Sequence, residues 1–350
     1  CVPMEERLTE KRKKEHIEVV LNEEVEEGWN GLQDVVLLHN ALPEIDFDEI
    51  DTSVEFLGKK LQMPLMISAI TGGTEEGKKI NKALARVAEK KGIGMGVGSQ
   101  RIAIEKPETL ETFYVRDVAP NILLLGNIGV TRLRDYGVEK VIELVEKTEA
   151  DGIAVHLNVA QELFQKEGEF DVNWRGCLKS IEELCKSASF PVMVKEVGCG
   201  ISREVAEKLK EAGVKAIDVA GWGGSNWILI ESLRSGKNVG EFRFWGIPTS
   251  CSILEVKEVG IDVIASGGIR TGLDIAKAIA LGAKVCAIAA PFLKILKKEG
   301  EEGVEKYVDR LLLDLKRAMM FTGCKSLDEL RKVPYVLKGF TKEWKEQRCK

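Results

Sequence analysis

The stretch DVIASGGIRTGLDIAKAIALGAKVCAIAA, residues 262–290, contains one complete unit of the pattern that decides the fold. It opens with a short apolar run, passes through Gly267 and Gly268, and closes with a second apolar run. Near-continuous apolar runs of this length are typical of parallel strands that are covered on both faces. The stretch therefore predicts a strand, a helix that starts near Thr271, and a second strand.

The same pattern extends back along the chain to residue 64. Six further apolar runs have the length of buried strands: PLMISAI (64–70), GIGMGVG (92–98), NILLLGNIG (121–129), GIAVHLN (152–158), PVMVKEV (191–197) and AIDVAG (216–221). Amphipathic stretches such as 75–92 and 202–214 separate them. Eight strand–helix units in roughly 250 residues are typical of a (β/α)₈ TIM barrel. A doubly wound α/β sheet is the alternative, but it seldom carries eight units of such regularity.

This pattern divides the chain into three parts. Residues 1–60 form an N-terminal extension, residues 61–340 form the barrel, and residues 341–350 form a C-terminal tail. A long insertion, 222–246, follows the sixth strand and precedes a helix expected at 247–259. Loops of this length are usually lids or binding loops.

The composition excludes several classes of protein. The chain has 350 residues, 44% of them hydrophobic and 31% charged, with a net charge of -5. This charge gives no global attraction for nucleic acid, so an anionic ligand needs a local cluster of donors. No apolar stretch approaches the roughly 20 residues of a membrane span, and no signal segment is evident. Eight scattered cysteines without a CxxC pair suit a reduced compartment. We expect a cytoplasmic protein without membrane or nucleic-acid partners.

In a TIM barrel the active site lies at the C-terminal ends of the strands. Polar residues and glycines gather at these ends: Thr71–Gly73, Ser99–Arg101, Asn127, His156, Asn158, Gln161, Glu162, Lys195, Glu196, 221–226, 266–270, Ala289 and Ala290. Leaving so many polar groups without partners is costly. We therefore interpret these ends as a binding site.

Each motif has a purely structural and a functional interpretation. Gly267 and Gly268, before a helix, are either a tight turn or a phosphate cradle. Lys195 either pairs with Glu196 or lies beside an anionic or electron-rich ligand. Glu162 is either a solvated side chain or a single ligand of Mg²⁺. Three histidines without HxxxH spacing argue against zinc. Hydrogen-bond donors at the ends of strands 1, 2, 3 and 5, together with a phosphate-binding cradle at strands 6–8, are the arrangement of a barrel that binds flavin mononucleotide (FMN).

The motifs together resemble the type 2 isopentenyl diphosphate isomerases, from about residue 11 to 339. The matching residues are Arg12-Lys13-x-x-His16, Thr71–Gly73, Gly98–Arg101, His156-Leu157-Asn158-x-x-Gln161-Glu162, Lys195-Glu196, 221–227, 266–270 and Ala289-Ala290. The family consists of FMN-dependent barrels that interconvert isopentenyl and dimethylallyl diphosphate.

The resemblance implies a role for each matching residue. FMN would be bound by Ala69, Ile70, Thr71, Gly72, Ser99, Asn127, Lys195, Ser225, Gly267, Gly268, Arg270, Ala289 and Ala290. The substrate would be bound by Arg12, Lys13, His16, Ser99, Gln100, Arg101, Asn158 and Gln161. Gln161 and His156 would be the catalytic residues, with Gln161 positioning the alkene or relaying a proton, and Glu162 would bind Mg²⁺. The resemblance also implies reduced FMN, NADPH or NADH as its reductant, and a homotetramer or homo-octamer.

An FMN-dependent oxidoreductase acting on a small phosphorylated or hydroxy-acid substrate is the rival hypothesis. Hydroxy-acid oxidases need a base, usually histidine, near the seventh strand, where this chain has only ASGGIR. Nucleotide-oxidising barrels need a cysteine in the loop after the sixth strand, where the sequence is GWGGSNW. A non-catalytic flavin carrier would have no use for Gln161 and Glu162.

Overall fold

The computed structural model describes residues 4–26, 28–166 and 172–349. The eight predicted strands close into one parallel barrel, in the order β10-β11-β4-β5-β6-β7-β8-β9. Their bounds are β4 (Leu65–Ile67), β5 (Gly94–Gly96), β6 (Leu124–Gly129), β7 (Gly152–His156), β8 (Val192–Lys195), β9 (Ala216–Asp218), β10 (Asp262–Ala265) and β11 (Val285–Ile288). The prediction of a TIM barrel is confirmed.

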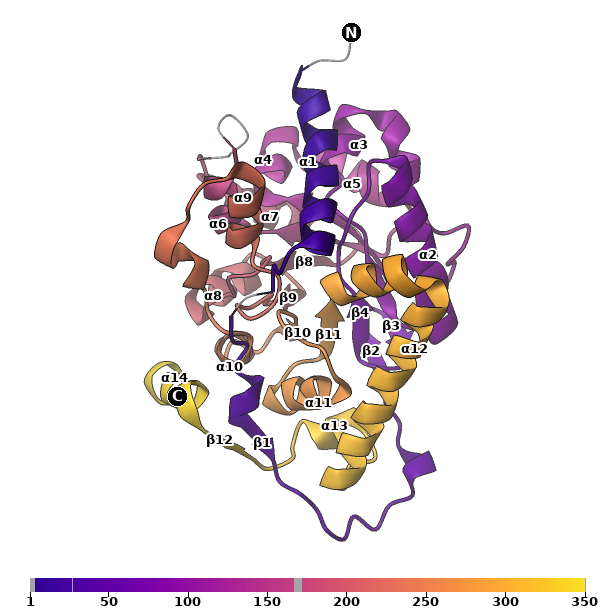
Figure 1. Ribbon diagram of the computed structural model, residues 1–350, viewed down its shortest axis with the longest axis vertical. Helices are drawn as coiled ribbons and strands as arrows, with labels where there is room; N and C mark the ends of the chain where they lie inside the picture. The colour runs from indigo at the N-terminus through magenta and orange to yellow at the C-terminus, as the bar shows by residue number, and fades with distance from the viewer. Residues whose placement is uncertain (1–3, 27, 167–171, 350) are drawn as a thin grey trace.

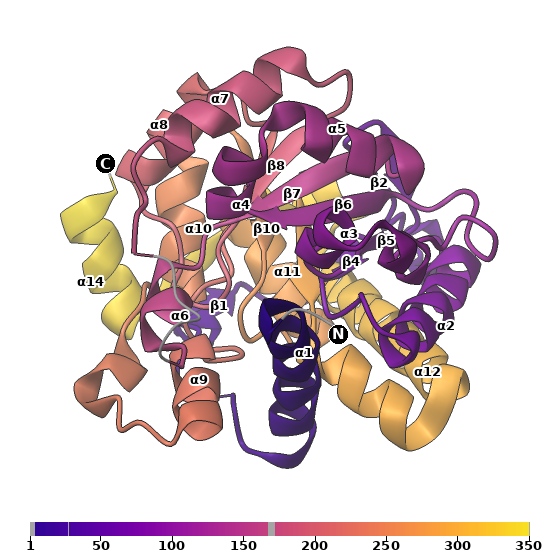
Figure 2. The same ribbon diagram turned by 90° about the horizontal axis from the view of Figure 1, so that it is seen from above.

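Helices surround the barrel, as the view from above shows (Figure 2). They are α2 (Glu75–Lys91), α3 (Arg101–Glu105), α4 (Val130–Tyr136), α5 (Val138–Lys147), α7 (Cys177–Ser187), α8 (Arg203–Glu211), α10 (Thr249–Lys257), α11 (Gly272–Leu281) and α12 (Ala290–Thr322). Local signals fix their ends. Helix α2 begins after Thr74, whose hydroxyl accepts the N–H of Gly77, and stops at Gly92 in a left-handed conformation.

The N-terminal extension reaches both ends of the barrel (Figure 1). Helix α1 (Met4–Asn22) stands at the end that carries the strand C-termini, in contact with α12 and with a helix of the insertion. Strand β1 (Val35–Leu37) pairs antiparallel with β12 (Tyr335–Leu337), so the extension and the C-terminal region form one ribbon. Strands β2 (Val54–Phe56) and β3 (Lys59–Leu61) form a hairpin next to the barrel.

Two segments are more ordered than the sequence suggested. The insertion at 222–246 contains helix α9 (Trp227–Ser235) and a short 3₁₀ helix at Gly240–Phe244, and α9 packs on α6 (Val159–Phe164). Residues 341–348, expected as a tail, belong to α14 (Gly339–Arg348), which follows the short helix α13 (Leu327–Leu330) and β12. The fully buried carboxylate of Glu255 accepts hydrogen bonds from Trp344 Nε1 at 2.9 Å and Arg348 Nε at 2.8 Å. These partners lie about 90 residues away in sequence, which is why the sequence pattern did not show them.

No helix within the described ranges combines the length and the apolar character that a membrane crossing requires.

Candidate active site

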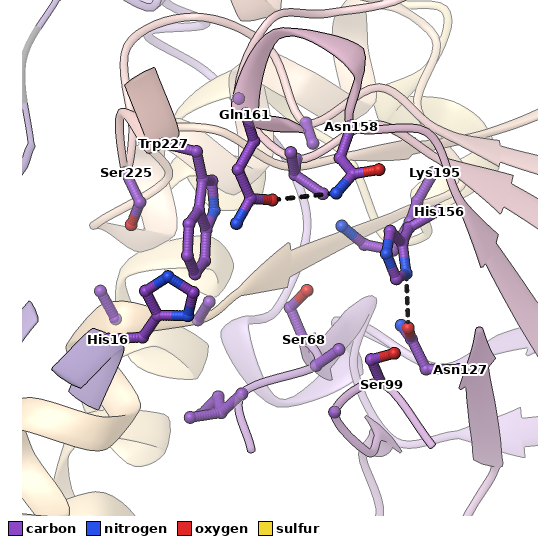
Figure 3. Close-up of a pocket in the computed structure, with 18 of the residues that line it drawn as sticks. His16, Ser68, Ser99, Asn127, His156, Asn158, Gln161, Lys195, Ser225 and Trp227 are labelled. Carbon is purple, nitrogen blue, oxygen red and sulfur yellow. Dashed lines mark hydrogen bonds between the residues drawn. The ribbon is translucent and has the colours of Figure 1, made fainter. Parts of the chain in front are cut away.

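A cavity of about 270 Å³ opens at the C-terminal ends of the barrel strands, and residues of α1, such as His16, also line it (Figure 3). Most of the predicted site residues line it: Arg12, Lys13, His16, Ala69, Ile70, Thr71, Ser99, Arg101, Asn127, His156, Asn158, Gln161, Glu162, Lys195, Ser225, Gly267, Gly268, Arg270, Ala289 and Ala290. They come from the N-terminal extension and from the segments that follow all eight strands, with Ser225 in the insertion after the sixth. The barrel thus brings together residues that are up to 278 positions apart.

Gly72 and Gln100 lie behind this lining rather than in it. The carbonyl oxygen of Gly72 accepts a hydrogen bond from Lys13 Nζ at 2.7 Å. The Gln100 side chain is fully buried, and its Oε1 accepts the backbone N–H of Asn127 at 2.9 Å. Its Nε2 has no hydrogen-bond partner among the described residues. In this structure Gln100 therefore supports the Asn127 backbone instead of facing the cavity.

His156 is held neutral at the end of β7. Its Nδ1 lies 2.8 Å from Asn127 Oδ1, an acceptor, so the ring carries its proton on Nδ1 (Figure 3). Burial, with Lys195 and Arg12 nearby, lowers the pKa of His156 to about 3. The Nε2 atom is left as a hydrogen-bond acceptor. A side chain at Gly129 would place its Cβ 3.0 Å from this atom, so the glycine leaves room for the ring.

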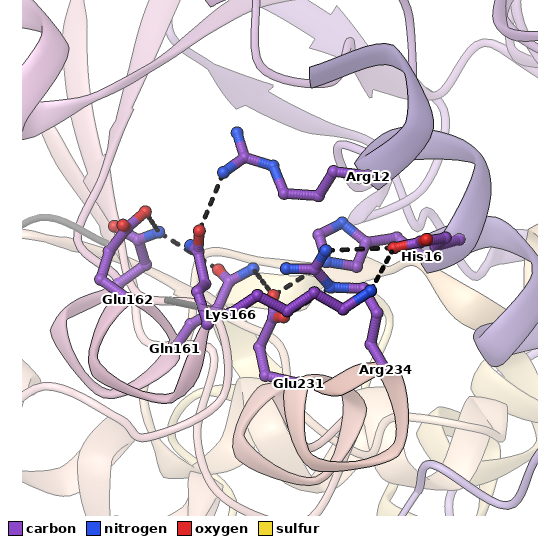
Figure 4. A network of polar contacts seen from close by, with 10 residues as sticks. Arg12, His16, Gln161, Glu162, Lys166, Glu231 and Arg234 are labelled. Atoms are coloured by element: carbon purple, nitrogen blue, oxygen red, sulfur yellow. Dashed lines mark hydrogen bonds and ion pairs between the residues drawn. The ribbon is translucent and has the colours of Figure 1, made fainter. Parts of the chain in front are cut away.

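Glu231, on α9 of the insertion, is the central anchor of the polar network above the cavity (Figure 4). Its side chain is fully buried. Oε1 accepts from His16 Nε2 at 2.8 Å and from Gln161 Nε2 at 3.1 Å, while Oε2 accepts from Arg234 Nε at 2.8 Å. Although burial raises the pKa of Glu231, these donors lower it to about 2, so the group is a carboxylate.

This network fixes Gln161 in one orientation. The amide nitrogen donates to Glu231, while Oε1 accepts from Asn158 Nδ2 at 3.2 Å. His16 is fixed as well, because its Nε2 donates to Glu231 and its ring meets the Trp227 ring edge-on, with 5.1 Å between the centroids. Burial lowers the pKa of His16, although the Glu231 carboxylate favours the protonated form. A neutral His16 still donates its Nε2–H to the carboxylate. Glu231 was not predicted, because it lies in the insertion beyond the 221–227 motif. Trp227 ends that motif, but no role was predicted for it.

Basic side chains gather where α1 meets the rim of the cavity. Lys13 Nζ donates to the carbonyl oxygens of Gly72 at 2.7 Å and Ser99 at 3.1 Å. Arg12 donates to Gln165 Oε1 at 2.8 Å, next to α6. Arg101 is paired with Glu105 at 2.6 Å. Arg132 also lines the cavity and was not predicted as a site residue. The rim thus presents four cations to an anionic ligand.

At the opposite side, two glycine turns pack backbone against backbone. A Cβ at Gly267 would lie 2.2 Å from the Gly221 oxygen, and a Cβ at Gly268 would lie 2.2 Å from the Gly223 oxygen. Asn30 of the N-terminal extension supports this packing, since its Nδ2 donates to the Gly268 oxygen at 2.7 Å. Only glycine permits this approach, which brings main-chain groups to the surface of the cavity.

Two helix starts lie next to the predicted phosphate position at Gly267 and Gly268. Before α11, Asp274 Oδ2 accepts from Arg270 N and Thr271 N, the two residues that precede the helix. Helix α12 begins at Ala290 with no side-chain cap, and both Ala289 and Ala290 line the cavity. Its first turn offers few N–H groups, because Pro291 has none and Phe292 N donates to Ala289 O at 3.1 Å. The phosphate cradle at the 267–268 turn stays a prediction.

Lys195 does not form the side-chain pair with Glu196 that was one interpretation of the sequence. Its Nζ donates to the Glu196 backbone oxygen at 2.6 Å, while the Glu196 carboxylate accepts the N–H groups of Val197, Gly198 and Cys199 at 2.6–2.7 Å. Lys195 is only 9% exposed and lines the cavity. It is therefore placed to meet a ligand.

Comparisons with known proteins assign this site to a family. The family model described as FMN-dependent dehydrogenase matches residues 18–112 and 131–336. The isopentenyl-diphosphate delta-isomerase of Pyrococcus furiosus is 47% identical over 96% of this chain and 89% of its own length. That of Halobacterium salinarum is 48% identical over 97% of both chains.

The chain belongs to the isopentenyl-diphosphate delta-isomerase family. Solved structures of other proteins share the fold of this chain. A Pediococcus acidilactici lactate oxidase superimposes with a TM-score of 0.69 at 17% identity, covering 96% of this chain and 95% of that one. A mandelate oxidase with (S)-2-phenylpropionate superimposes with a TM-score of 0.63 at 20% identity, covering 88% of both. At these identities the likeness concerns the fold alone.

The residues of this isomerase-family chain fit FMN. The 267–268 turn and the start of α12 lie on neighbouring strand ends, and backbone N–H groups there would bind the phosphate of FMN. Ser99, Asn127 and Lys195 line the same cavity from β5, β6 and β8, with donors suited to a polar heterocycle. The cavity therefore has a phosphate end and a ring end, which a flavin nucleotide requires.

The Mg²⁺ hypothesis depends on Glu162 alone. Its Oε1 accepts from Asn158 Nδ2 at 2.9 Å, and the side chain lines the cavity. No group of three or more His, Cys, Asp or Glu side chains suited to a metal occurs in the part of the chain that the structure describes. One protein carboxylate is enough for Mg²⁺ when water and phosphate oxygens complete the coordination shell.

Proposed function

We propose that this chain interconverts isopentenyl diphosphate and dimethylallyl diphosphate, with reduced FMN and Mg²⁺ as cofactors. The observation that carries the proposal is that Lys13, Gln161 and Glu162 face the same cavity as the glycine turn. A hydroxy-acid oxidase would need the glycine turn and a histidine base at the seventh strand. It would not need basic residues on α1 that bind a diphosphate, or a buried carboxylate that orients Gln161.

The diphosphate would bind between α1 and the barrel rim. Arg12, Lys13, Arg101 and Arg132 supply charge there, and arginine can bind phosphate oxygens through two hydrogen bonds. Lys13 would exchange its two carbonyl partners for phosphate oxygens, which are stronger acceptors. Ser99, His16 and Asn158 line the same region and would complete the substrate site.

The reaction is a 1,3-proton shift across an unactivated alkene, which requires a dry site and stabilisation of developing positive charge. Reduced FMN, when bound, supplies an electron-rich surface and a nitrogen that can carry a proton. Gln161 would hold the alkene next to that surface, because Glu231 and Asn158 fix both ends of its amide. His156 would act through Nε2 as an uncharged acceptor, since a cation there would repel the positive charge that develops on the substrate.

The acidic side of the site would bind the metal. Mg²⁺ on Glu162 would share its coordination shell with the diphosphate oxygens and neutralise part of their charge. Asn158 holds the Glu162 carboxylate before the metal arrives. This division leaves Glu231 to organise the network and Glu162 to take the cation.

Further properties belong to the same proposal. NADPH or NADH would reduce the flavin, since the isomerisation itself consumes no electrons. The active form would be a cytoplasmic homotetramer or homo-octamer, with the two diphosphates as its only substrates. Nucleic acid would not be a partner, given the net charge of -5.

The test is an anaerobic isomerisation in D₂O. Isopentenyl diphosphate is incubated with the protein, FMN, dithionite and Mg²⁺, and the products are examined by NMR. We expect deuterated dimethylallyl diphosphate, lost when FMN or Mg²⁺ is withheld. A bound, reducible flavin without isomerisation would contradict the proposal, and bleaching of the flavin by a hydroxy acid would favour an oxidase.

A further inference from the structure

A second, smaller cavity lies in the barrel interior. Its volume is about 20 Å³, enough for one water molecule. Its lining is mostly apolar, with Met66, Leu125 and Met193 among its residues, but it also contains Lys195 and Asp218. Lys195 lines both this cavity and the active-site cavity. The lysine therefore connects the barrel interior to the ring end of the site.

Asp218 is an unusual residue for the interior of a barrel. It is 2% exposed, and a buried carboxylate is costly unless it is neutralised or hydrogen-bonded. Asp218 and Lys195 are direct register partners on the neighbouring strands β9 and β8. Because both side chains also line the small cavity, they lie on the same inner face of the barrel.

The carboxylate of Asp218 is fixed from two sides. Its Oδ1 accepts a hydrogen bond of 2.5 Å from Ser266 Oγ on the neighbouring strand end and one of 3.2 Å from Ala220 N. Burial raises the pKa of Asp218 above its ordinary value, and the charge of Lys195 and the hydrogen bonds from Ser266 and Ala220 offset only part of this rise. The ammonium of Lys195 is itself directed to the Glu196 backbone oxygen at 2.6 Å.

We infer that Asp218 is a positioning residue that acts through Lys195, as the buried counter-charge that limits the positive charge presented to the flavin. The inference rests on the proposed function for the presence of FMN, and it concerns a residue outside the active-site lining. Asp218 and Lys195 share the small cavity on the inner side of the barrel, so the carboxylate would offset part of the ammonium charge that the flavin meets. Without this counter-charge the ammonium would stabilise the reduced, anionic flavin more strongly.

This arrangement predicts a change in the reduction potential of bound FMN. Asp218→Asn keeps the size of the side chain and the acceptor for Ser266, but it removes the charge. The charge of Lys195, no longer offset by a buried carboxylate, then stabilises the reduced flavin more strongly. At a fixed potential we expect the ratio of reduced to oxidised FMN to rise by roughly tenfold, which is about 30 mV for a two-electron couple.

The potential is measured on the holoprotein by equilibration with a reference dye. Asp218→Asn should shift it to more positive values, and Lys195→Met should shift it to more negative ones. In the Lys195→Met background, Asp218→Asn should have little further effect, because its action passes through Lys195. An unchanged potential in Asp218→Asn, or an undiminished shift in the double variant, would overturn the inference.

A second variant covers the case in which Asp218→Asn does not fold. Ser266→Ala removes the hydroxyl donor but keeps the carboxylate, which favours protonation of Asp218. It should shift the potential in the same direction by less, and an opposite shift or none would overturn the inference. Failure of the wild-type protein to bind FMN would overturn the proposed function together with the inference. A bound flavin with the expected shifts but no isomerase activity would overturn the proposed function alone.

Discussion

Glu231 Oε1 accepts a hydrogen bond from Gln161 Nε2 at 3.1 Å, so a residue of the insertion sets the orientation of an amide that points into the cavity. The same oxygen atom accepts from His16 Nε2 at 2.8 Å. One buried carboxylate thereby connects three segments of the chain: α1, α6 and α9. The insertion after the sixth strand therefore contributes to the candidate site, since Ser225 and Trp227 line the cavity and Glu231 orients Gln161.

Replacing Glu231 by glutamine should disorder Gln161. The new amide can turn its NH₂ toward Gln161, which then rotates away from its present orientation. A misplacement of about 1 Å costs roughly 100-fold in rate, and we expect a loss of this size in kcat in the deuterium-exchange assay. Glu241→Gln, an exposed site in the same insertion, is the control and should leave kcat unchanged. Equal kcat values in both variants would contradict the role of Glu231.

The fold could be predicted from the sequence because each strand of the barrel is a local apolar run. Val285–Ile288 is fully buried, as its unbroken apolar pattern requires. Helix α14 could not be predicted in the same way. Its place is fixed by Trp344 and Arg348 binding Glu255, and no local pattern encodes a contact over such a separation.

Site residues next to strand ends were predictable for the same reason, since the barrel topology determines where a strand end lies. His156 and Lys195 follow from their strands alone. Glu231 does not, because its position depends on how α9 packs on α1 and α6. The partners of Asp274 could not be predicted either, because a carboxylate at this position can face solvent or accept the N–H groups of Arg270 and Thr271, as it does here.

Lys13→Met should weaken substrate binding while leaving FMN binding intact. A hydrogen bond to a charged group is worth about 1.5–3 kcal/mol, so the KM for isopentenyl diphosphate should rise by roughly 10- to 100-fold. Lys14→Met is the matched control, because Lys14 is the next residue and is exposed. The measurement is initial rate against substrate concentration. A similar rise in KM in both variants would indicate a general effect of charge on α1.

Glu162→Gln should raise the Mg²⁺ concentration needed for half-maximal activity by at least tenfold. The amide keeps an acceptor for Asn158 Nδ2 but offers the cation no negative charge. Titration of activity with Mg²⁺ measures the effect, with Glu183→Gln on α7 as an exposed control. If the titration curve of Glu162→Gln overlays that of the wild type, Glu162 is not the metal ligand.

His156 should make the protein sensitive to mild acid. Its pKa is lowered from 6.5 to about 3 in the folded chain. Between these values the unfolded chain binds a proton that the folded chain does not, so stability falls as the pH decreases. The loss from this group should be about 2 kcal/mol at pH 5.

Denaturant unfolding of wild type and His156→Asn at pH 7 and pH 5 measures this difference. The wild type should lose more free energy of unfolding than the variant over this interval. His16 is present in both proteins, so its own contribution cancels. Equal losses in the two proteins would show that His156 titrates normally in the folded state.

Gly268→Ala should abolish tight FMN binding. The added Cβ would lie 2.2 Å from the Gly223 oxygen, so the two turns must separate and the anion-binding end must deform. Gly58→Ala is a close control for backbone strain, because Gly58 has φ +82° against +83° for Gly268 but nothing within 4 Å of the new methyl group. Titration of the apoprotein with FMN should show at least a 100-fold weaker Kd for Gly268→Ala and a near wild-type Kd for Gly58→Ala. If both variants bind FMN equally well, the close packing of the two turns is not what builds the phosphate end of the site.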